Sequence, residues 1–216
     1  MGGYWVKETQ VGAGFNRRFK GMDLIVGEMT LESLVKLAVA AESREPTADG
    51  HQGRVAVIST LIAEELGLDD AVVDGVRIAG QLHDIGKVRV SSDALAGDGQ
   101  FGLAEWERVK THCQTGYEIL AEASFETPVA EMVLQHHERL DGSGYPSGLR
   151  GKEILLGSRI IAVADTVEDE VSRGSGDVSR RLDAALDKIT DGRGNLFDRH
   201  VVDACRHVRL GIAELF

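Results

Sequence analysis

The chain has 216 residues, enough for one domain of ordinary size with a well-buried core and a short extension. Its residues are 43% hydrophobic and 27% charged, which is typical of a globular protein, and no apolar run is long enough to span a bilayer. The formal net charge of -11 argues against long nucleic acid as a partner, because duplex binding depends on Lys and Arg side chains that neutralise phosphates. A small phosphate ligand stays possible, since a metal cluster can reverse the field locally.

The N-terminal thirty residues contain no apolar segment between a basic start and a small-residue cleavage site, so no secretory signal is visible. A cytoplasmic location is therefore expected. Two cysteines, Cys113 and Cys205, are expected to be reduced and to serve as small, partly buried apolar residues. By composition, residues 1–28 are expected to form an arm or linker, and residues 29–216 to form the domain.

Apolar residues recur with helical spacing along nearly the whole chain, and no hairpin signature or convincing alternating run occurs. The sequence therefore predicts an all-α fold, a single helical bundle. Its first helix is expected to begin after the capping residue Thr30 and to end before Pro46. The next helix is expected to begin at His51 and to end at Gly67, which has the backbone freedom that a C-terminal cap needs.

A third helix, capped by Asp69 or Asp70, is expected to bring His83 and Asp84 to its last turn. The following helical pattern places His112 beside an apolar face, so that the imidazole is expected to point inward. That face consists of Leu103, Trp106, Val109, Cys113, Gly116, Tyr117 and Leu120.

Thr127 followed by Pro128 is a good helix start, with proline at the first helical position, and this helix is expected to end in His136 and His137. The glycine-rich segment 142–151 is expected to form an ordered turn.

Residues 154–171 are expected to form a strongly apolar helix, which makes Asp165 in its middle conspicuous because a buried carboxylate needs a cation. Asp177 and Asp198 are expected to cap two last helices. The apolar face of the second consists of Val201, Val202, Cys205, Val208, Ile212 and Leu215.

Five of the seven histidines and two acids occupy apolar faces or helix ends. They are His51, His83, Asp84, His112, His136, His137 and Asp165. This mixture of nitrogen and oxygen donors suits divalent transition metals and is poor for calcium, so that iron, manganese and zinc stay open. Since the donors come from several helices, a site inside a helical bundle is favoured over a local zinc finger.

Seven donors exceed the three protein ligands of an ordinary catalytic ion and match two ions, with Asp84 as the natural bridge. Two adjacent cations can activate water and hold the attacking and leaving oxygens of a phosphoryl group, so phosphoester hydrolysis is the favoured reaction. Lys87 could offer a positive charge to a phosphate oxygen. Alternatively, Lys87 only favours the C-terminal end of a helix dipole.

HDIGK at residues 83–87 resembles the signature of the HD superfamily of metal-dependent phosphohydrolases, and HHERLDGSGYPSGL at 136–149 is similar to the hallmark of its HD-GYP subfamily. The similarity extends from about residue 30 to about residue 205. It implies a helical bundle with a centre of two or three iron or manganese ions. Such a centre would hydrolyse the bacterial messenger cyclic di-GMP to the linear dinucleotide and, in some members, to GMP.

The resemblance also implies roles for individual residues. One ion would be held by His51, His83, Asp84 and Asp165, and the other by Asp84, His112, His136 and His137. The segment Gly144, Tyr145 and Pro146 would shape a loop for substrate or for a signalling protein partner. Contacts to substrate are also expected for Lys87, Arg139, Asp141 and Glu168.

Two departures from the family pattern alter these expectations. Members with a third ion carry a glutamate at the position of Thr47, so two ions are expected here. After the residue equivalent to Asp165, many active members have a second aspartate and then a Ser-x-Arg-Pro-Tyr-Arg run. Here Glu168 replaces that aspartate and the Arg-Pro-Tyr element is missing, so the metal chemistry is expected to be intact and the substrate grip altered. The basic residues available as substitutes are Arg173, Arg180 and Arg181.

Three functions follow from these observations. The first is a phosphodiesterase of cyclic di-GMP. The second keeps the metals but acts on a hybrid cyclic dinucleotide, a linear dinucleotide or a nucleotide phosphate, because the Arg-Pro-Tyr element is missing. The third is a signalling module that binds nucleotide or a partner protein through the GYP loop without useful turnover.

Ordinary structural roles are the alternative for several polar residues. The loop glycines, together with Glu138, Arg139 and Asp141, could serve only turn geometry. The acidic run 168–170 is expected to be a solvated face. His200 and His207 are assigned to the surface.

Overall fold

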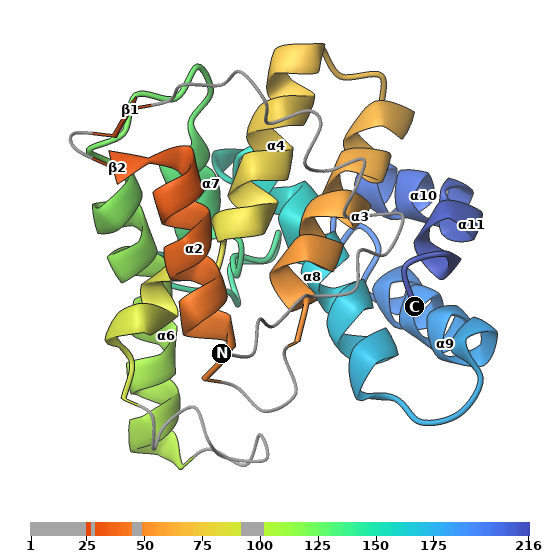
Figure 1. Ribbon diagram of the computed structural model, residues 1–216. Coiled ribbons are helices and arrows are strands. Elements are labelled where there is room, and N and C mark those ends of the chain that lie inside the picture. Colours follow the sequence, from red (N-terminus) through yellow and green to blue (C-terminus); the bar gives the residue numbers. More distant parts are fainter. Residues whose placement is uncertain (1–24, 27–28, 45–48, 92–101) are drawn as a thin grey trace, which may run out of the picture.

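The computed structural model describes residues 25–26, 29–44, 49–91 and 102–216. These residues form a bundle of helices, which confirms the all-α prediction (Figure 1). One short antiparallel ladder was not expected: β1 (Ile25–Val26) pairs with β2 (Met29–Thr30). Most of the expected arm, residues 1–28, lies outside the described residues, so the proposed domain boundary stays a prediction.

The first two helices begin where the sequence indicates. Helix α2 (Leu31–Glu42) is capped by Thr30, whose hydroxyl accepts a hydrogen bond from the backbone N–H of Ser33 at 3.2 Å. Helix α3 (His51–Glu65) follows Gly50 and is succeeded by Gly67, and both glycines have positive φ angles. His51 is thus held at the N-terminus of α3.

Close backbone packing brings the HDIGK segment, residues 83–87, against the helix that carries His112. Helix α4 (Asp70–Leu82) ends at His83, and the 3₁₀ helix η1 (Ile85–Arg89) begins after Asp84. A Cβ atom on Gly86 would lie 2.0 Å from the carbonyl oxygen of His112, so only glycine permits η1 to approach helix α6 (Leu103–Leu120) this closely.

The apolar face predicted for α6 is correct only from Val109 onward. Leu103 is 88% exposed and Trp106 is 39% exposed, although the ring of Trp106 lies 5.9 Å from that of Tyr145. Helix α7 (Val129–Gln135) follows Pro128. Pro128 was predicted to be the first helical residue, but it is the N-cap residue.

The C-terminal third contains η2 (Gly151–Glu153), α8 (Leu156–Arg173), α9 (Val178–Asp191), α10 (Arg199–His207) and α11 (Arg209–Ala213). Asp177 and Asp198 cap α9 and α10, as predicted. The prediction of one final helix is wrong, because the chain leaves helical geometry at Val208. After this break Ile212 is fully buried in the core.

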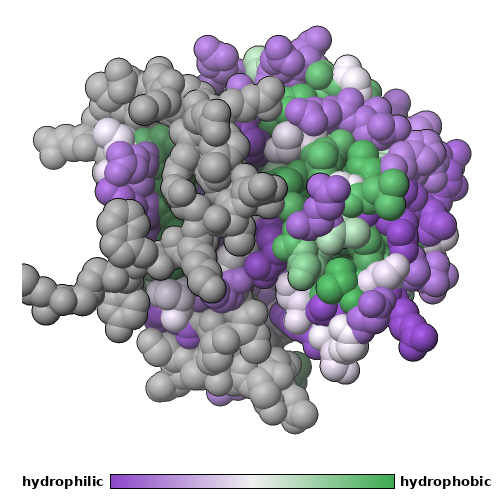
Figure 2. Space-filling view, turned by 45° about the vertical axis from the view of Figure 1, so that its right-hand side comes forward, coloured by the Kyte–Doolittle hydropathy of each residue, from purple (hydrophilic) through white to green (hydrophobic). Residues whose placement is uncertain are grey.

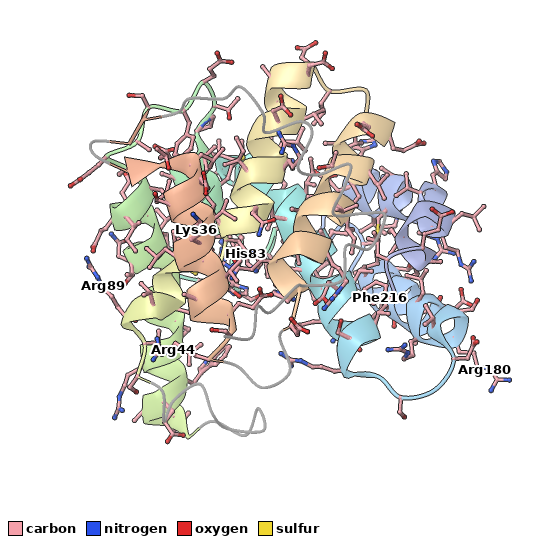
Figure 3. All side chains as sticks on the ribbon, viewed as in Figure 1. Lys36, Arg44, His83, Arg89, Arg180 and Phe216 are labelled. Atoms are coloured by element: carbon pink, nitrogen blue, oxygen red, sulfur yellow. The ribbon has the colours of Figure 1, made fainter. Side chains whose placement is uncertain are left out.

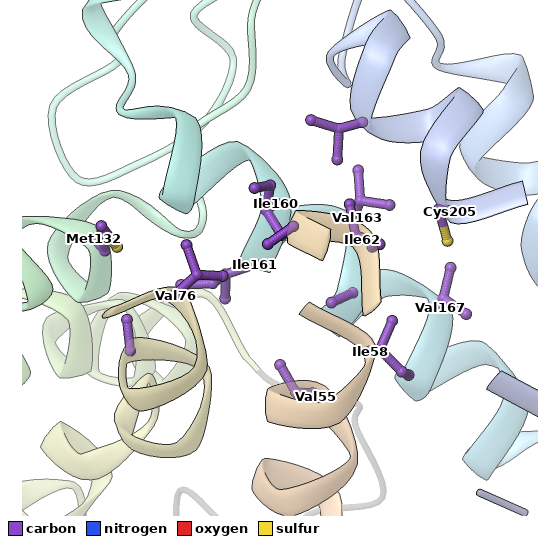
Figure 4. Close-up of a cluster of buried hydrophobic side chains, with 14 of the residues drawn as sticks. Val55, Ile58, Ile62, Val76, Met132, Ile160, Ile161, Val163, Val167 and Cys205 are labelled. Carbon is purple, nitrogen blue, oxygen red and sulfur yellow. The ribbon is translucent and has the colours of Figure 1, made fainter. Parts of the chain in front are cut away.

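The centre of the core is formed by α3, α4 and α8, and α3 packs against both of the others. Figure 4 shows side chains of this core, including one from α7 and one from α10, and each buried aliphatic chain contributes about 1.5–3 kcal/mol. Those labelled are Val55, Ile58, Ile62, Val76, Met132, Ile160, Ile161, Val163, Val167 and Cys205. This packing fixes the relative positions of the polar residues that the same helices carry.

The surface agrees with the acidic, polar composition. In Figure 2 hydrophilic residues surround a smaller hydrophobic area on the right-hand part of the face shown. Within the part of the chain that the structure describes, no helix has the length and apolarity needed to cross a membrane. His200 and His207 are exposed, as predicted, and both Cys113 and Cys205 are buried free thiols.

Candidate metal centre

The seven predicted donors converge in the interior of the bundle from α3, α4, α6, α7 and α8 and the segments that follow them. Figure 3 shows His83 in the middle of the bundle, whereas the labelled Arg89 and Arg180 lie at its left and right edges. Six of the seven donors are buried and His137 is half-buried. The donors form two groups that share Asp84.

The first group contains His51, His83, Asp84 and Asp165. Nε2 of His51 lies 3.2 Å from Nε2 of His83 and 3.4 Å from Oδ1 of Asp165. Nε2 of His83 lies 3.3 Å from Oδ2 of Asp84. The four side chains therefore direct their donor atoms at one small volume.

The second group contains Asp84, His112, His136 and His137. Nε2 of His112 lies 3.3 Å from Oδ1 of Asp84 and 3.3 Å from Nε2 of His136. The rings of His136 and His137 have centroids 4.0 Å apart. Asp84 therefore offers one carboxylate oxygen to each group.

Backbone carbonyls fix the orientation of three of these rings. The Nδ1–H groups of His83, His112 and His136 donate to the carbonyl oxygens of Gly80, Val109 and Val133 at 2.8, 2.6 and 2.6 Å. A neutral imidazole whose Nδ1 carries the proton has a lone pair on Nε2. The lone pairs of His112 and His136 consequently face each other, an arrangement that a shared cation stabilises.

The spacing of the donors also fits ions. Two nitrogen or oxygen donors bound to one transition ion at about 2.1 Å lie about 3.0–3.4 Å apart in octahedral or tetrahedral geometry. Five distances of 3.2–3.4 Å within the two groups are of this size. Two further pairs of the first group, His51 with Asp84 and His83 with Asp165, are 3.8 and 3.7 Å apart. The described donors can therefore hold divalent metal ions, although their arrangement does not select the element.

The protonation of the histidines differs between the two groups. Burial lowers the pKa of His136 to about 3, and it also lowers the pKa values of His112 and His137. Burial opposes the charged form of His51 as well, but hydrogen bonds to Asp165 and Glu168 outweigh it and raise the pKa of His51 well above its usual value. The three histidines of the second group are thus neutral at physiological pH, as metal binding requires.

The carboxylates at the centre are held in their charged form. Burial favours protonated Asp84, but Lys87, His83 and other positive neighbours outweigh burial and keep the pKa of Asp84 well below its usual value. Burial also favours protonated Asp165, but a hydrogen bond donated by His51 and the charges of neighbouring histidines outweigh burial and lower the pKa of Asp165. Ionised carboxylates are the form that binds cations.

Glu168 lies behind His51 rather than at the rim of the site. Its buried carboxylate contacts Nδ1 of His51 and accepts hydrogen bonds from Nε of Arg54 at 2.7 Å and from the hydroxyl of Ser172 at 2.6 Å. The prediction of a solvated acidic face is wrong for Glu168, because this residue is on the same side of α8 as Asp165. Its contacts favour orientation of His51, and the substrate contact stays a prediction.

The rest of the acidic run is more exposed than Glu168. Asp169 is half-buried, and burial together with the charge of Asp165 raises its pKa to about 6. One carboxylate oxygen of Asp169 lies within 4.8 Å of donor atoms of His51 and Asp165, so Asp169 is a further potential donor that the sequence analysis missed. Glu170 instead pairs with Lys188.

Lys87 lies at the edge of the centre, with Nζ 2.7 Å from Oδ2 of Asp84 and a side chain that is 16% exposed. Lys87 thus pairs with the carboxylate that the two donor groups share, and its contact with phosphate stays a prediction.

A buried carboxylate organises the GYP loop. Glu138 accepts hydrogen bonds from the backbone N–H groups of Ser147 at 2.7 Å and Leu149 at 3.0 Å. A Cβ atom on Gly144 would lie 2.4 Å from Cα of Glu138 and 2.5 Å from the carbonyl oxygen of His137. The loop can therefore contact the His137 segment only with glycine at position 144.

The other loop residues predicted to bind substrate have different surroundings. The ring of Tyr145 lies 4.7 Å from that of His137 and 5.9 Å from that of Trp106, next to the centre. Asp141 accepts hydrogen bonds from Ser143, and Pro146 is exposed. These contacts place the aromatic pair beside the donors, whereas Asp141 stabilises the turn.

Arg139 turns toward the protein. Its guanidinium donates to the carbonyl oxygens of His136 and Glu138 and stacks over the ring of Phe197. Burial lowers its pKa from the ordinary arginine value. These contacts are structural, so a role for Arg139 in substrate binding stays a prediction.

Of the basic residues considered as substitutes for the Arg-Pro-Tyr element, Arg173 contacts a potential donor of the centre, whereas Arg180 and Arg181 have other surroundings. Arg173 pairs with Asp169 at 3.2 Å, and Arg181 donates to carbonyl oxygens of Val171 and Gly174. Figure 3 shows Arg180 at the outer edge of the bundle. The departure at Thr47 lies outside the described residues.

Comparison with known proteins agrees with this geometry. A family model described as the HD domain matches residues 36–201. The chain belongs to the HD domain family. The HDIGK segment supplies His83, a donor of the first group, and Asp84, which the two groups share.

Relatives of this HD domain include named phosphodiesterases. The cyclic di-GMP phosphodiesterase response regulator RpfG of Xanthomonas campestris is 36% identical over 192 residues, which cover 88% of this chain and 51% of that protein. A cyclic di-GMP phosphodiesterase of Thermotoga maritima is 34% identical over 193 residues, with coverages of 88% and 52%. The 3′3′-cGAMP-specific phosphodiesterase 3 of Vibrio cholerae is 44% identical over 124 residues, with coverages of 57% and 27%. The chain thus spans about half the length of the first two relatives.

Solved structures share the fold of this HD domain. The HDG"Y"P protein Bd1817 of Bdellovibrio bacteriovorus aligns with a TM-score of 0.64 at 16% identity, covering 92% of this chain and 69% of that one. The HD domain of the L. monocytogenes phosphodiesterase PgpH, solved with cyclic-di-AMP, aligns with a TM-score of 0.59 at 20% identity and covers 82% of this chain and 93% of that one. At these identities the likeness concerns the fold.

Proposed function

We propose that this HD domain is a metal-dependent phosphodiesterase of a cyclic dinucleotide, with cyclic di-GMP as its preferred substrate. The seven donors described above would hold two divalent ions. Iron and manganese are favoured over zinc. The two relatives that align over 88% of the chain support this substrate, because both are named as phosphodiesterases of cyclic di-GMP. The cytoplasmic location and the protein partner of the GYP loop stay predictions.

The observation that carries the proposal is the position of Asp84 between two groups of imidazoles. Its Oδ1 faces His112, and its Oδ2 faces His83 and Lys87. Two cations held by these donors would activate a water molecule and neutralise the charge of a phosphoryl group. Phosphodiester hydrolysis needs both of these effects.

The protein's own residues would orient the reaction. Asp84 would align the two groups through one rigid carboxylate, and the carbonyls of Gly80, Val109 and Val133 would keep the imidazole lone pairs directed inward. Lys87 would hold a positive charge beside a nonbridging phosphate oxygen or the leaving oxygen.

A second candidate substrate is 3′3′-cGAMP. The phosphodiesterase 3 of Vibrio cholerae, named as specific for that compound, has the higher identity of 44% over a shorter alignment. The missing Arg-Pro-Tyr element and the outward position of Arg180 also agree with an altered substrate grip.

The test is anaerobic purification with metal quantification, followed by product analysis with cyclic di-GMP, 3′3′-cGAMP, cyclic di-AMP and a linear dinucleotide. Reducing conditions are needed because the activity of an iron centre changes with its oxidation state. We expect the metal-loaded protein to cleave cyclic di-GMP fastest, giving the linear dinucleotide or GMP. Faster cleavage of 3′3′-cGAMP would establish the second candidate. Nucleotide binding without product would favour a signalling module.

A further inference from the structure

Cys113 is a fully buried thiol beside three histidines of the second donor group. Its Sγ lies 3.5 Å from Nε2 of His112. One donor atom from each of His112, Cys113, His136 and His137 lies within 4.8 Å of all the others. The sulfur is therefore part of the same cluster as the imidazoles that would hold the second ion.

Two distances in this cluster match those between ligands of one ion. Bonds of about 2.1 Å to nitrogen and about 2.3 Å to sulfur in tetrahedral geometry separate two nitrogens by about 3.4 Å and a nitrogen from a sulfur by about 3.6 Å. The Nε2 atoms of His112 and His136 are 3.3 Å apart, and Sγ of Cys113 lies 3.5 Å from Nε2 of His112. No large rearrangement is needed for the thiolate to bind.

A simple hydrogen bond explains the arrangement less completely. The thiol of Cys113 could donate to Nε2 of His112 as a weak S–H donor. Since the Nδ1–H of His136 is already directed at the carbonyl of Val133, Nε2 of His136 would then still face the Nε2 of His112, which is another acceptor. A cation among the four donors satisfies both nitrogens and the sulfur together.

We propose that Cys113 is a thiolate ligand of the ion held by Asp84, His112, His136 and His137, and that its sulfur biases this position toward zinc or iron and away from manganese. This inference rests on the proposed function to the extent that the centre must hold metal. Soft thiolate donors prefer zinc and iron–sulfur chemistry, whereas carboxylates and water suit manganese. The sulfur would therefore make the two metal positions unequal.

Two measurements on the complete 216-residue chain test the proposal. The first is X-ray absorption spectroscopy of the wild-type protein loaded with zinc alone, where we expect a sulfur scatterer at about 2.3 Å. The second is absorption spectroscopy of the cobalt(II)-loaded protein, where we expect a thiolate-to-metal charge-transfer band. Both readouts are independent of catalytic turnover.

The matched variants are Cys113→Ala and Cys205→Ala, because both cysteines are fully buried and only Cys113 lies in the cluster. We expect Cys113→Ala to lose the band and to bind zinc at least about tenfold more weakly, with little change in manganese affinity. We expect Cys205→Ala to keep the band. Thermal unfolding of both variants checks that they fold.

The outcomes separate this inference from the proposed function. A wild-type protein that binds two zinc ions without a sulfur scatterer, or a Cys113→Ala protein that keeps the band, overturns the thiolate ligand and leaves the metal centre intact. A wild-type protein that binds no ion at all overturns both. X-ray absorption spectroscopy of the zinc-loaded wild-type protein shows whether sulfur binds the ion even if Cys113→Ala does not fold.

Discussion

The buried carboxylate of Glu168 contacts Nδ1 of His51, on the side of the ring opposite the nitrogen that faces Asp165. A carboxylate in this position fixes the tautomer and direction of a metal-binding imidazole, and its loss typically lowers metal affinity about 10–100-fold. We expect Glu168→Gln to lower metal affinity by this amount and kcat with it. Metal titration and steady-state kinetics measure the two effects.

Glu170→Gln is the matched control for this prediction, because Glu170 is on the same helix and contacts Lys188 instead of the centre. A Glu168→Gln protein with wild-type metal affinity and only a raised KM would instead support the substrate contact predicted from the sequence.

Gly144 determines whether the GYP loop can contact the His137 segment. The alanine Cβ would overlap backbone atoms of His137, Glu138 and Arg139, which cannot rotate away. We expect Gly144→Ala to destabilise the protein by about 1–3 kcal/mol and to reduce activity. Urea unfolding and kinetics check both effects.

Gly53→Ala provides the contrast, because Gly53 is inside α3 and an added Cβ would have nothing within 4 Å. We expect this helical substitution to stabilise the protein by about 0.5–1 kcal/mol. Equal stability changes for the two variants would show that the close contact at Gly144 has no energetic weight.

Lys87 is predicted to act on the phosphate rather than to hold metal. We expect Lys87→Met to lower kcat by about 100-fold while the metal content stays at the wild-type level, because one charge-stabilising donor is lost. Arg89→Met is the control, since Arg89 is on the same 3₁₀ helix and pairs with Glu118 at the surface. A Lys87→Met protein with unchanged kcat would leave Lys87 with only the helix-dipole role.

Asp198 gives a prediction about pH that is independent of the metal centre. Burial favours its neutral form, but hydrogen bonds from Arg159 and from the N–H of His200 outweigh burial, so its pKa is lowered in the folded protein. A lowered pKa contributes stability above the ordinary aspartate pKa of about 3.9, and this contribution is lost as the pH falls through the folded value.

We therefore expect Asp198→Ala to cost about 1–2 kcal/mol at pH 7, and a smaller amount below about pH 4. Asp198→Asn keeps a helix cap and loses only the charge, so it is expected to cost less at pH 7. Urea unfolding at both pH values measures the differences, and a cost for Asp198→Ala that rises on acidification would contradict the assigned direction.

The sequence was sufficient to predict where most helices begin and to single out the histidines and acids that the structure brings together, because the relevant signals are local. Thr30, Asp177 and Asp198 have the chemistry of N-caps, and His51 follows a glycine that can adopt a positive φ angle. The donors were recognisable because their polar side chains interrupt otherwise apolar helices.

Features that depend on tertiary packing were missed. The inward position of Glu168 depends on Arg54 and His51, which are more than 100 residues away in the sequence. Cys113 was taken as an apolar residue, because nothing local shows that its sulfur faces His136.

In the proposed mechanism, Asp84 joins two metal positions in one hydrolytic centre. The most direct measurement is the metal content of anaerobically purified wild-type and Asp84→Ala proteins, with cyclic di-GMP turnover followed in the same samples. Asp203→Ala serves as the control, because Asp203 pairs with Arg193 at the surface. We predict two ions per chain and hydrolysis for the wild type and the control, and loss of both metal and hydrolysis for Asp84→Ala. Wild-type turnover by a metal-free Asp84→Ala protein would contradict the account.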